Sequence, residues 1–383
     1  MPKTSADLLP VPPIDQLRLR RSAKWQRYPA DVLPLWVAEM DFELAPAIAT
    51  TLTEAVRRSD TGYAFDDGAL GRALAAFAGQ RWGWQFDPAS VHVVADIEVG
   101  VVELLRVLTR PGEAVVISPP VYSPFFGWIG EVRGRLVEVP LRRADGWRLD
   151  LPALERAFAD RPAAYLLCNP HNPVGRAHSR QELTELVELA ARYQVPIVSD
   201  EAHAPLVLPG ARFTPLLSVA GAAELAVSVQ AASKAWNLAG LKAAAVISAS
   251  ARMAEVVRAL PNSRWRVGHF GALASVVAYT EEGAWLDRLL ATLVERRALL
   301  GELLADRLPA LSWRPPQASY LGWLDCDGLG IDGDASQRFL QHGVAVDAGR
   351  TFGAIGADHV RLNFATSAEI LTEAVDRMAS ALS

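Results

Sequence analysis

Residues 232–242 read ASKAWNLAGLK, and they follow an apolar run at residues 226–229 that has the length of a buried strand. This stretch contains Lys234 and Lys242, two of only four lysines in a chain with 38 lysine and arginine residues. A lysine amine can lose its proton and bond covalently to an aldehyde, whereas an arginine side chain does neither in a protein. Because the chain uses arginine for most of its positive charge, we expect Lys234 to have a chemical role. The alternative is that both lysines lie at the surface.

Length and composition limit the classes of protein. A chain of 383 residues is long enough for two domains, and its hydrophobic content of 51% argues against extensive disorder. The net charge of −5, without a dense basic block, argues against nucleic-acid binding. No apolar stretch is long enough to cross a membrane, and the N-terminus does not resemble a secretory signal. We therefore expect a cytoplasmic protein with reduced Cys168 and Cys326, and no metal-binding spacing is present.

Strands and helices are expected to alternate from residue 91 onward. The expected strands are short and apolar throughout, which is typical of a sheet covered by helices on both faces. This pattern predicts an α/β fold with a doubly wound sheet. The expected strands are residues 91–94, 114–117, 135–139, 163–167, 196–199, 226–229 and 243–247, and the expected helices are residues 45–58, 69–82, 100–108, 151–159 and 180–193.

The pattern of expected helices and strands changes after residue 281. A long amphipathic helix is expected first, then short strands and a last helix, which together predict a smaller α+β domain. These elements are residues 284–307, 320–324, 344–346, 359–363 and 368–382. We expect a large domain over residues 46–283, and a small domain formed by the arm at residues 1–45 together with residues 284–383.

Four kinds of polar or aromatic side chain follow the ends of expected strands. Tyr122, Asn172, Asp200 and Lys234 each come within a few residues of such an end. In open α/β sheets, ligands bind outside the carboxyl ends of the strands. We therefore expect an aromatic ring, an amide, a carboxylate and an amine to meet at one edge of the sheet.

This combination makes chemical sense as a pyridoxal phosphate site. Lys234 would hold the aldehyde covalently, and Asp200 would keep the pyridine nitrogen protonated so that the ring accepts electrons. Asn172 would donate a hydrogen bond to the phenolic oxygen, and Tyr122 would stack on the ring. Each motif also has a simpler interpretation, because Asn-Pro sequences are mostly turns and Asp-Glu pairs are often helix caps or solvated charges.

The phosphate of such a cofactor would need donors close to Lys234. Ser233 and Lys242 could bind it, together with backbone N–H groups at the start of the helix near Glu98 and Val99. The first N–H groups of a helix have no partner within the helix and attract anions.

These motifs resemble those of the fold-type I pyridoxal phosphate enzymes, the class I/II aminotransferase superfamily, and within it the MalY/PatB-type cystathionine β-lyase branch. The resemblance covers nearly the whole chain from about residue 15, and it implies a large domain with a mixed, mostly parallel sheet and a smaller α+β domain. The stretches that carry it are WVAEMDF at residues 36–42, GY at 62–63, SPPVY at 118–122, NPHNPVG at 169–175, SDEAH at 199–203, SKAWNLAGLK at 233–242 and VRLNFATS at 360–367.

The resemblance also implies roles for individual residues. Lys234 would be both the residue that holds the cofactor and the base that moves the substrate's α-proton. His203 stands where many aminotransferases have a tyrosine that bonds the phenolic oxygen, and Arg361 would bind the substrate's α-carboxylate. Tyr63 would reach the phosphate of a neighbouring subunit, which implies a homodimer with shared active sites. The superfamily usually has arginine at the position of Lys242.

The implied reaction is α,β-elimination from an S-substituted cysteine such as L-cystathionine, which yields a thiol, pyruvate and ammonia. Asp41 and Trp236 would help to select the small-molecule amino-acid substrate. An aminotransferase shares the early steps and is the alternative. A regulatory protein that senses a metabolite is a third possibility, but the two expected domains leave no segment for DNA binding.

Overall fold

A computed structural model describes residues 8–261 and 266–382. Its largest sheet has seven strands in the order β2-β8-β7-β6-β5-β3-β4. The pairs from β4 to β7 are parallel, whereas β8 runs antiparallel to both β7 and β2. This mixed, mostly parallel sheet confirms the predicted α/β class. The bounds are β2 Val91–Val94, β3 Ala114–Ile117, β4 Arg135–Glu138, β5 Ala164–Cys168, β6 Ile197–Asp200, β7 Ala226–Gln230 and β8 Ala244–Ser248.

Alternate residues of the strands enter two different hydrophobic cores. In β3, Val115 and Ile117 pack into one core, and Val116 packs into the other. The first core is completed by α5 (Ile97–Leu108), α6 (Pro124–Glu131) and α9 (Ala251–Arg258), and the second includes residues of α4 (Ala69–Trp82), α7 (Leu151–Ala159) and α8 (Arg180–Tyr193). Burial of both faces explains why the strand sequences are apolar without alternation.

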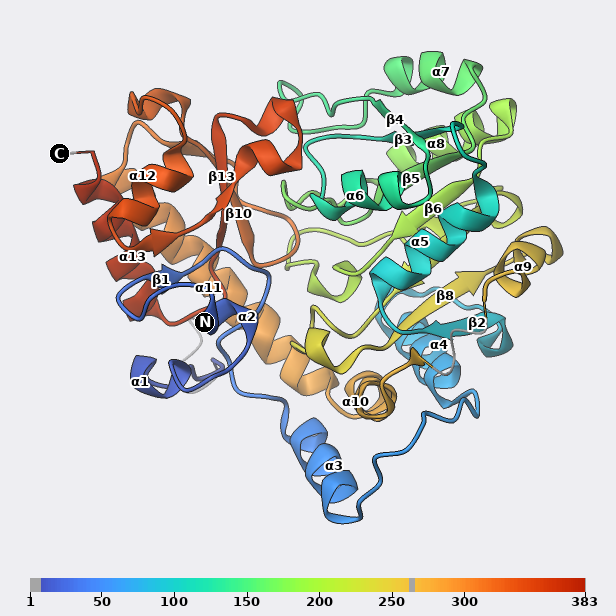
Figure 1. Ribbon diagram of the computed structural model, residues 1–383, viewed down its shortest axis with the longest axis horizontal. Helices are drawn as coiled ribbons and strands as arrows, with labels where there is room; N and C mark the ends of the chain where they lie inside the picture. Colours follow the sequence, from blue (N-terminus) through green and yellow to red (C-terminus); the bar gives the residue numbers. More distant parts are fainter. Residues whose placement is uncertain (1–7, 262–265, 383) are drawn as a thin grey trace.

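Three helices in this part of the chain were missed by the sequence analysis, namely α6, α9 and α10 (His269–Thr280). Helix α10 packs against α4 and against α3 (Pro46–Arg57), as Figure 1 shows in the lower part of the molecule. Its residues are apolar on nearly all sides, so the sequence lacks the one-sided pattern by which a surface helix is predicted.

The C-terminal part forms a second layer of helices and strands. Its sheet has the order β12-β13-β10-β9, and α11 (Gly283–Arg307) and α13 (Ala368–Ser380) pack together beside it. Helix α12 (Ala335–Gln341) contacts β11 and β12. The strand bounds are β9 Ser312–Trp313, β10 Leu321–Asp325, β11 Val344–Ala345, β12 Asp347–Ala348 and β13 His359–Asn363.

The N-terminal arm lies against this C-terminal part, as Figure 1 shows by the blue segment beside the red one. The arm contains two short helices, α1 (Ile14–Leu17) and α2 (Ala23–Gln26), and the strand β1 (Leu33–Pro34), which pairs in parallel with β11. This placement agrees with an arm that belongs to the smaller domain. The exact boundaries after residues 45 and 283 stay a prediction.

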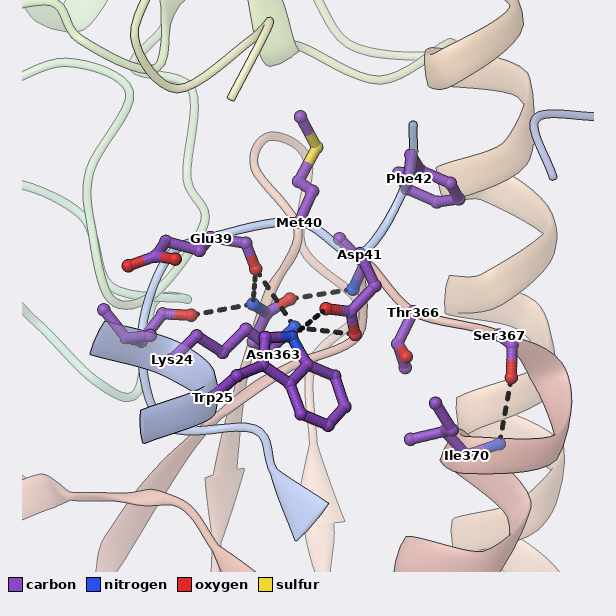
Figure 2. A network of polar contacts seen from close by, with 12 residues as sticks. Lys24, Trp25, Glu39, Met40, Asp41, Phe42, Asn363, Thr366, Ser367 and Ile370 are labelled. Carbon is purple, nitrogen blue, oxygen red and sulfur yellow. Dashed lines mark hydrogen bonds and ion pairs between the residues drawn. The ribbon is translucent and has the colours of Figure 1, made fainter. Parts of the chain in front are cut away.

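Residues 36–42, which we call the strap, run from the arm toward the large sheet. A buried ion pair fixes the strap: Lys24 Nζ lies 2.8 Å from Asp41 Oδ2, and both side chains are 1% exposed. Trp25 Nε1 donates to Asp41 Oδ1 at 3.0 Å, and Asn363 Nδ2 donates to the Glu39 carbonyl at 2.6 Å (Figure 2). Burial lowers the pKa of Lys24, and the nearby Asp41 carboxylate offsets part of that effect.

Replacement of one member of this pair should destabilise the protein strongly. Lys24→Met would leave the Asp41 carboxylate buried without its countercharge, at a cost of about 3–5 kcal/mol. The exposed pair of Arg58 and Glu54 supplies the control, because Arg58→Met should change the free energy of unfolding by less than about 1 kcal/mol. Urea unfolding of both variants measures the difference. Equal midpoints for Lys24→Met and Arg58→Met would show that the buried pair does not hold the strap.

Candidate active site

A cavity of about 170 Å³ lies at the carboxyl ends of the large sheet. Most of the predicted site residues meet there, although they come from strands and loops far apart in the sequence. The register of the strands explains this, since Cys168 at the end of β5 pairs with Asp200 at the end of β6, and Asp200 pairs with Val229 in β7. The predicted residues that line the cavity are Glu98, Tyr122, Asn172, Asp200, His203, Ser233, Lys234 and Lys242.

Lys234 is held four residues beyond the end of β7. Its Nζ donates to the carbonyl of Ala38 in the strap at 3.4 Å. Burial lowers the pKa of Lys234 to about 8, because an ammonium loses its hydration there, and the charge of Arg361 lowers it further. The carboxylates of Asp200 and Glu39 act in the opposite direction. About a tenth of the amine is therefore neutral at pH 7, far more than for a lysine in water, and the neutral form is the one that acts as a nucleophile or base.

Asp200 is the last residue of β6, and its carboxylate is buried. One oxygen accepts a hydrogen bond from the Ala202 N–H at 3.0 Å. Burial raises the pKa of Asp200 to about 6, whereas that hydrogen bond and the charge of Lys234 lower it. A cationic group brought next to this carboxylate would stabilise its charged form and lower its pKa.

The neighbouring Glu201 serves a different purpose. Its carboxylate accepts hydrogen bonds from Ser199, Ser228 and Gln230 side chains and from the Leu216 N–H, all between 2.7 and 3.0 Å. Burial raises the pKa of Glu201, and these four donors offset part of that effect. The Asp-Glu pair of the sequence therefore separates into one residue at the cavity and one that is fixed in the interior.

Arg361 in β13 reaches the same region from the smaller sheet. It donates to Asn172 Oδ1 at 3.1 Å and to Asp347 Oδ2 at 2.7 Å, and it lies over the ring of Phe352. Its Nε is buried and has no hydrogen-bond partner among the residues that the structure describes. Asp347 was not predicted, because the pairing joins two strands whose contact the sequence does not reveal.

Tyr122 and His203 complete the cavity wall around Asn172. Burial raises the pKa of Tyr122 to about 12 and lowers the pKa of His203 to about 3, so both side chains are neutral at physiological pH. His203 Nδ1 is buried without a hydrogen-bond partner among the described residues. Tyr122 makes edge contacts with the rings of Phe125 and Trp128, which fix its orientation.

The start of α5 faces the cavity, as predicted, but with an acidic residue that the sequence analysis missed. Asp96 caps this helix by accepting a hydrogen bond from the Val99 N–H at 2.8 Å, and its other oxygen lies 2.6 Å from Lys242 Nζ. Val99 is therefore engaged by the cap and does not line the cavity. A polar residue three positions before Val99 was the available signal, since Asp is a preferred N-cap.

Three predicted site residues lie elsewhere. Asp41 is paired with Lys24, and Trp236 is fully buried, with its Nε1 donating to the Glu282 carbonyl at 3.4 Å. Tyr63 is 82% exposed on the surface. The substrate-binding roles of Asp41 and Trp236 stay predictions, although these contacts favour structural roles for both.

The described residues, 8–261 and 266–382, contain no group of three or more His, Cys, Asp or Glu side chains that could hold a metal ion. Within the same residues, no helix is long and apolar enough to span a membrane.

The chain belongs to the aminotransferase class I and II family, which it matches over residues 30–378. It is 35% identical to the cystathionine beta-lyase of Corynebacterium glutamicum, over 97% of this chain and 99% of that protein. It is 34% identical to the cystathionine beta-lyase PatB of Bacillus subtilis, over 95% and 97%. The crystal structure of cystalysin from Treponema denticola, which contains pyridoxal 5′-phosphate, has a TM-score of 0.88 at 26% identity, over 95% and 96% of the two chains.

Asp200→Asn should stabilise the protein in the absence of bound small molecules. Because folding raises the pKa of Asp200 from 3.8 to about 6, its ionisation destabilises the fold above pH 6, by about 2–3 kcal/mol. The gain in the free energy of unfolding on replacement by Asn should therefore be largest at pH 7.5 and decrease as the pH falls toward 4. Unfolding midpoints of the variant and the wild type across this pH range measure this gain. Glu201→Gln is the control and should lower the free energy of unfolding, since four hydrogen-bond donors lose their carboxylate acceptor. A similar decrease in the free energy of unfolding for Asp200→Asn at pH 7.5 would contradict the account.

Proposed function

We propose that the protein is a pyridoxal phosphate-dependent carbon–sulfur β-lyase that cleaves L-cystathionine or related S-substituted cysteines. The observation that carries this proposal is the shared cavity of Lys234, with its lowered pKa, and the buried carboxylate of Asp200. The names of the relatives from Corynebacterium glutamicum and Bacillus subtilis support the lyase activity.

The residues of the cavity fit pyridoxal phosphate. Lys234 would bind the aldehyde, and Asp200 would pair with the protonated pyridine nitrogen, which explains why its carboxylate is buried without a full set of donors. Asn172 and His203 would lie at the phenolic oxygen, and Tyr122 would stack on the ring. When bound, the cofactor withdraws electrons from the substrate's α-carbon and so makes its proton removable.

Ser233, Lys242 and the N-terminus of α5 would hold the phosphate group. They line the same cavity, and the partial positive charge of the helix end favours an anion. Asp96 and Glu98 bring two negative charges to this end, so Lys242 would serve both the phosphate and Asp96. This arrangement differs from the arginine usual at the position of Lys242.

The chain's own groups would carry the proton and the substrate. Arg361 would bind the α-carboxylate, for which its unsatisfied Nε offers a donor. The neutral amine of Lys234 would remove the α-proton, and the same side chain could protonate the departing sulfur. Addition of one water then gives the thiol, pyruvate and ammonia. An aminotransferase is the second candidate, because the family includes such enzymes and the same residues serve both reactions.

We further propose a homodimer with shared active sites and a cytoplasmic location. Tyr63 and Phe65 are each 82% exposed, and such adjacent large rings are typical of a surface that another subunit covers. Tyr63 would then reach the phosphate end of the partner's cavity. Both cysteines are free and buried, as is usual for proteins of a reducing compartment.

Incubation with L-cystathionine and no keto acid tests the proposed reaction. We expect free thiol, pyruvate and ammonia in equal amounts over many turnovers, because thiolate departure needs no second substrate. Product analysis over time measures the three yields, and protein with Lys234→Ala is the control and should release none. A reaction that stops after one turnover and resumes only when a keto acid is added would favour the aminotransferase.

A further inference from the structure

A groove with a volume of about 480 Å³ lies outside the active-site cavity, and none of the described residues lines both spaces. Its walls come from the last turns of α4, the start of α8, the first turns of α11 and the loop that begins directly after His203. A space of this size can hold a small organic molecule. Because arginine and apolar side chains line the groove together, it suits a ligand that carries both negative charge and apolar surface.

Three arginines bring positive charge to this groove, namely Arg81, Arg180 and Arg212. Arg81 donates to both carboxylate oxygens of Asp287, at 2.5 and 3.2 Å, so its charge is compensated. Among the residues that the structure describes, no carboxylate pairs with Arg180 or Arg212, and none lines the groove. The groove therefore carries two uncompensated positive charges in a protein whose net charge is −5.

Arg180 is oriented at a position that is unfavourable for a cation. It is the first residue of α8, where the partial positive charge of the helix end repels a guanidinium. Its side chain donates to the carbonyl and to the hydroxyl of Ser218, each at 3.2 Å. Both acceptors are neutral, so they orient the guanidinium and leave its charge uncompensated. An anion bound here would be stabilised by the guanidinium and by the helix end together.

Aromatic side chains form the apolar part of the groove. The ring centroids of Trp82 and Phe213 lie 4.9 Å apart, and those of Phe77 and Trp82 lie 5.4 Å apart. Phe77 and Phe213 are buried, whereas Trp82 is only partly buried and leaves surface for a ligand. Such a wall of rings suits a ligand that is itself aromatic.

We propose that this groove binds a small aromatic phosphate, with the ring packed against Trp82 and Phe213 and the phosphate held by Arg180 and Arg212. A phosphate monoester carries almost two negative charges at neutral pH, which matches two uncompensated guanidinium groups. Arginine also presents its donors in a fork that fits phosphate oxygens. This binding site is separate from the reaction proposed above and does not depend on it.

Calorimetric titration of the cofactor-loaded protein with 1-naphthyl phosphate tests the proposal, after dialysis has removed excess cofactor. We expect one site per chain with a Kd below about 1 mM. Arg180→Gln and Arg212→Gln should each weaken binding about fivefold or more, because each removes a charge-assisted contact. Arg252→Gln is the matched control and should not change the Kd, since Arg252 is likewise an exposed arginine in the first turn of a helix, α9, but lies outside the groove.

Two further ligands separate the contributions of ring and phosphate. Inorganic phosphate lacks the ring and 1-naphthol lacks the charge, so each should bind about tenfold or more weakly than 1-naphthyl phosphate. Equal affinity for inorganic phosphate, or no binding of 1-naphthyl phosphate by the wild type, would overturn the proposal even if a variant does not fold. Equal affinity of the wild type and both groove variants would show that the compound binds elsewhere, and would overturn it as well.

Discussion

Burial of two opposite charges, those of Lys234 and Asp200, sets the properties of the site. Desolvation lowers the pKa of Lys234 to about 8 and raises the pKa of Asp200 to about 6, so both groups are less stable in their charged forms than they would be in water. Both residues lie at the carboxyl ends of neighbouring strands, because Asp200 is the last residue of β6, β6 pairs with β7, and Lys234 follows the end of β7 by four residues. A bound cofactor with an aldehyde and a basic ring nitrogen would relieve this destabilisation at both positions.

The buried ion pair of Lys24 and Asp41 connects the N-terminal arm to the stretch that contains Lys234. It fixes the strap, and the strap in turn supplies the Ala38 carbonyl, which accepts a hydrogen bond from Lys234. Asn237, which follows Lys234 by three residues, bonds both the N–H and the carbonyl of Met40. Hydrogen bonds therefore connect the strap to the stretch that contains Lys234 and Asn237.

The fold class could be predicted from the sequence, and so could the meeting of most candidate site residues at one cavity, because short apolar strands and the polar residues after them are local patterns. The partners Asp347 of Arg361 and Asp96 of Lys242 could not, since each pair joins segments that only the folded chain brings together. The sequence motif around Asp41 predicted a substrate contact and did not reveal that its carboxylate is buried against Lys24; the substrate-binding role stays a prediction. Helix α10 was missed because it is apolar on nearly all sides.

The central claim is that Lys234, and no other lysine, bonds covalently to the cofactor. The most direct test is to reduce the purified, cofactor-loaded protein with borohydride, digest it and map the labelled peptide by mass spectrometry. The account predicts that the pyridoxyl label lies on Lys234 and that neither Lys24 nor Lys242 carries it, since Lys24 is paired with Asp41 and Lys242 with Asp96. A label on another lysine, or a loaded protein without any label, would contradict it.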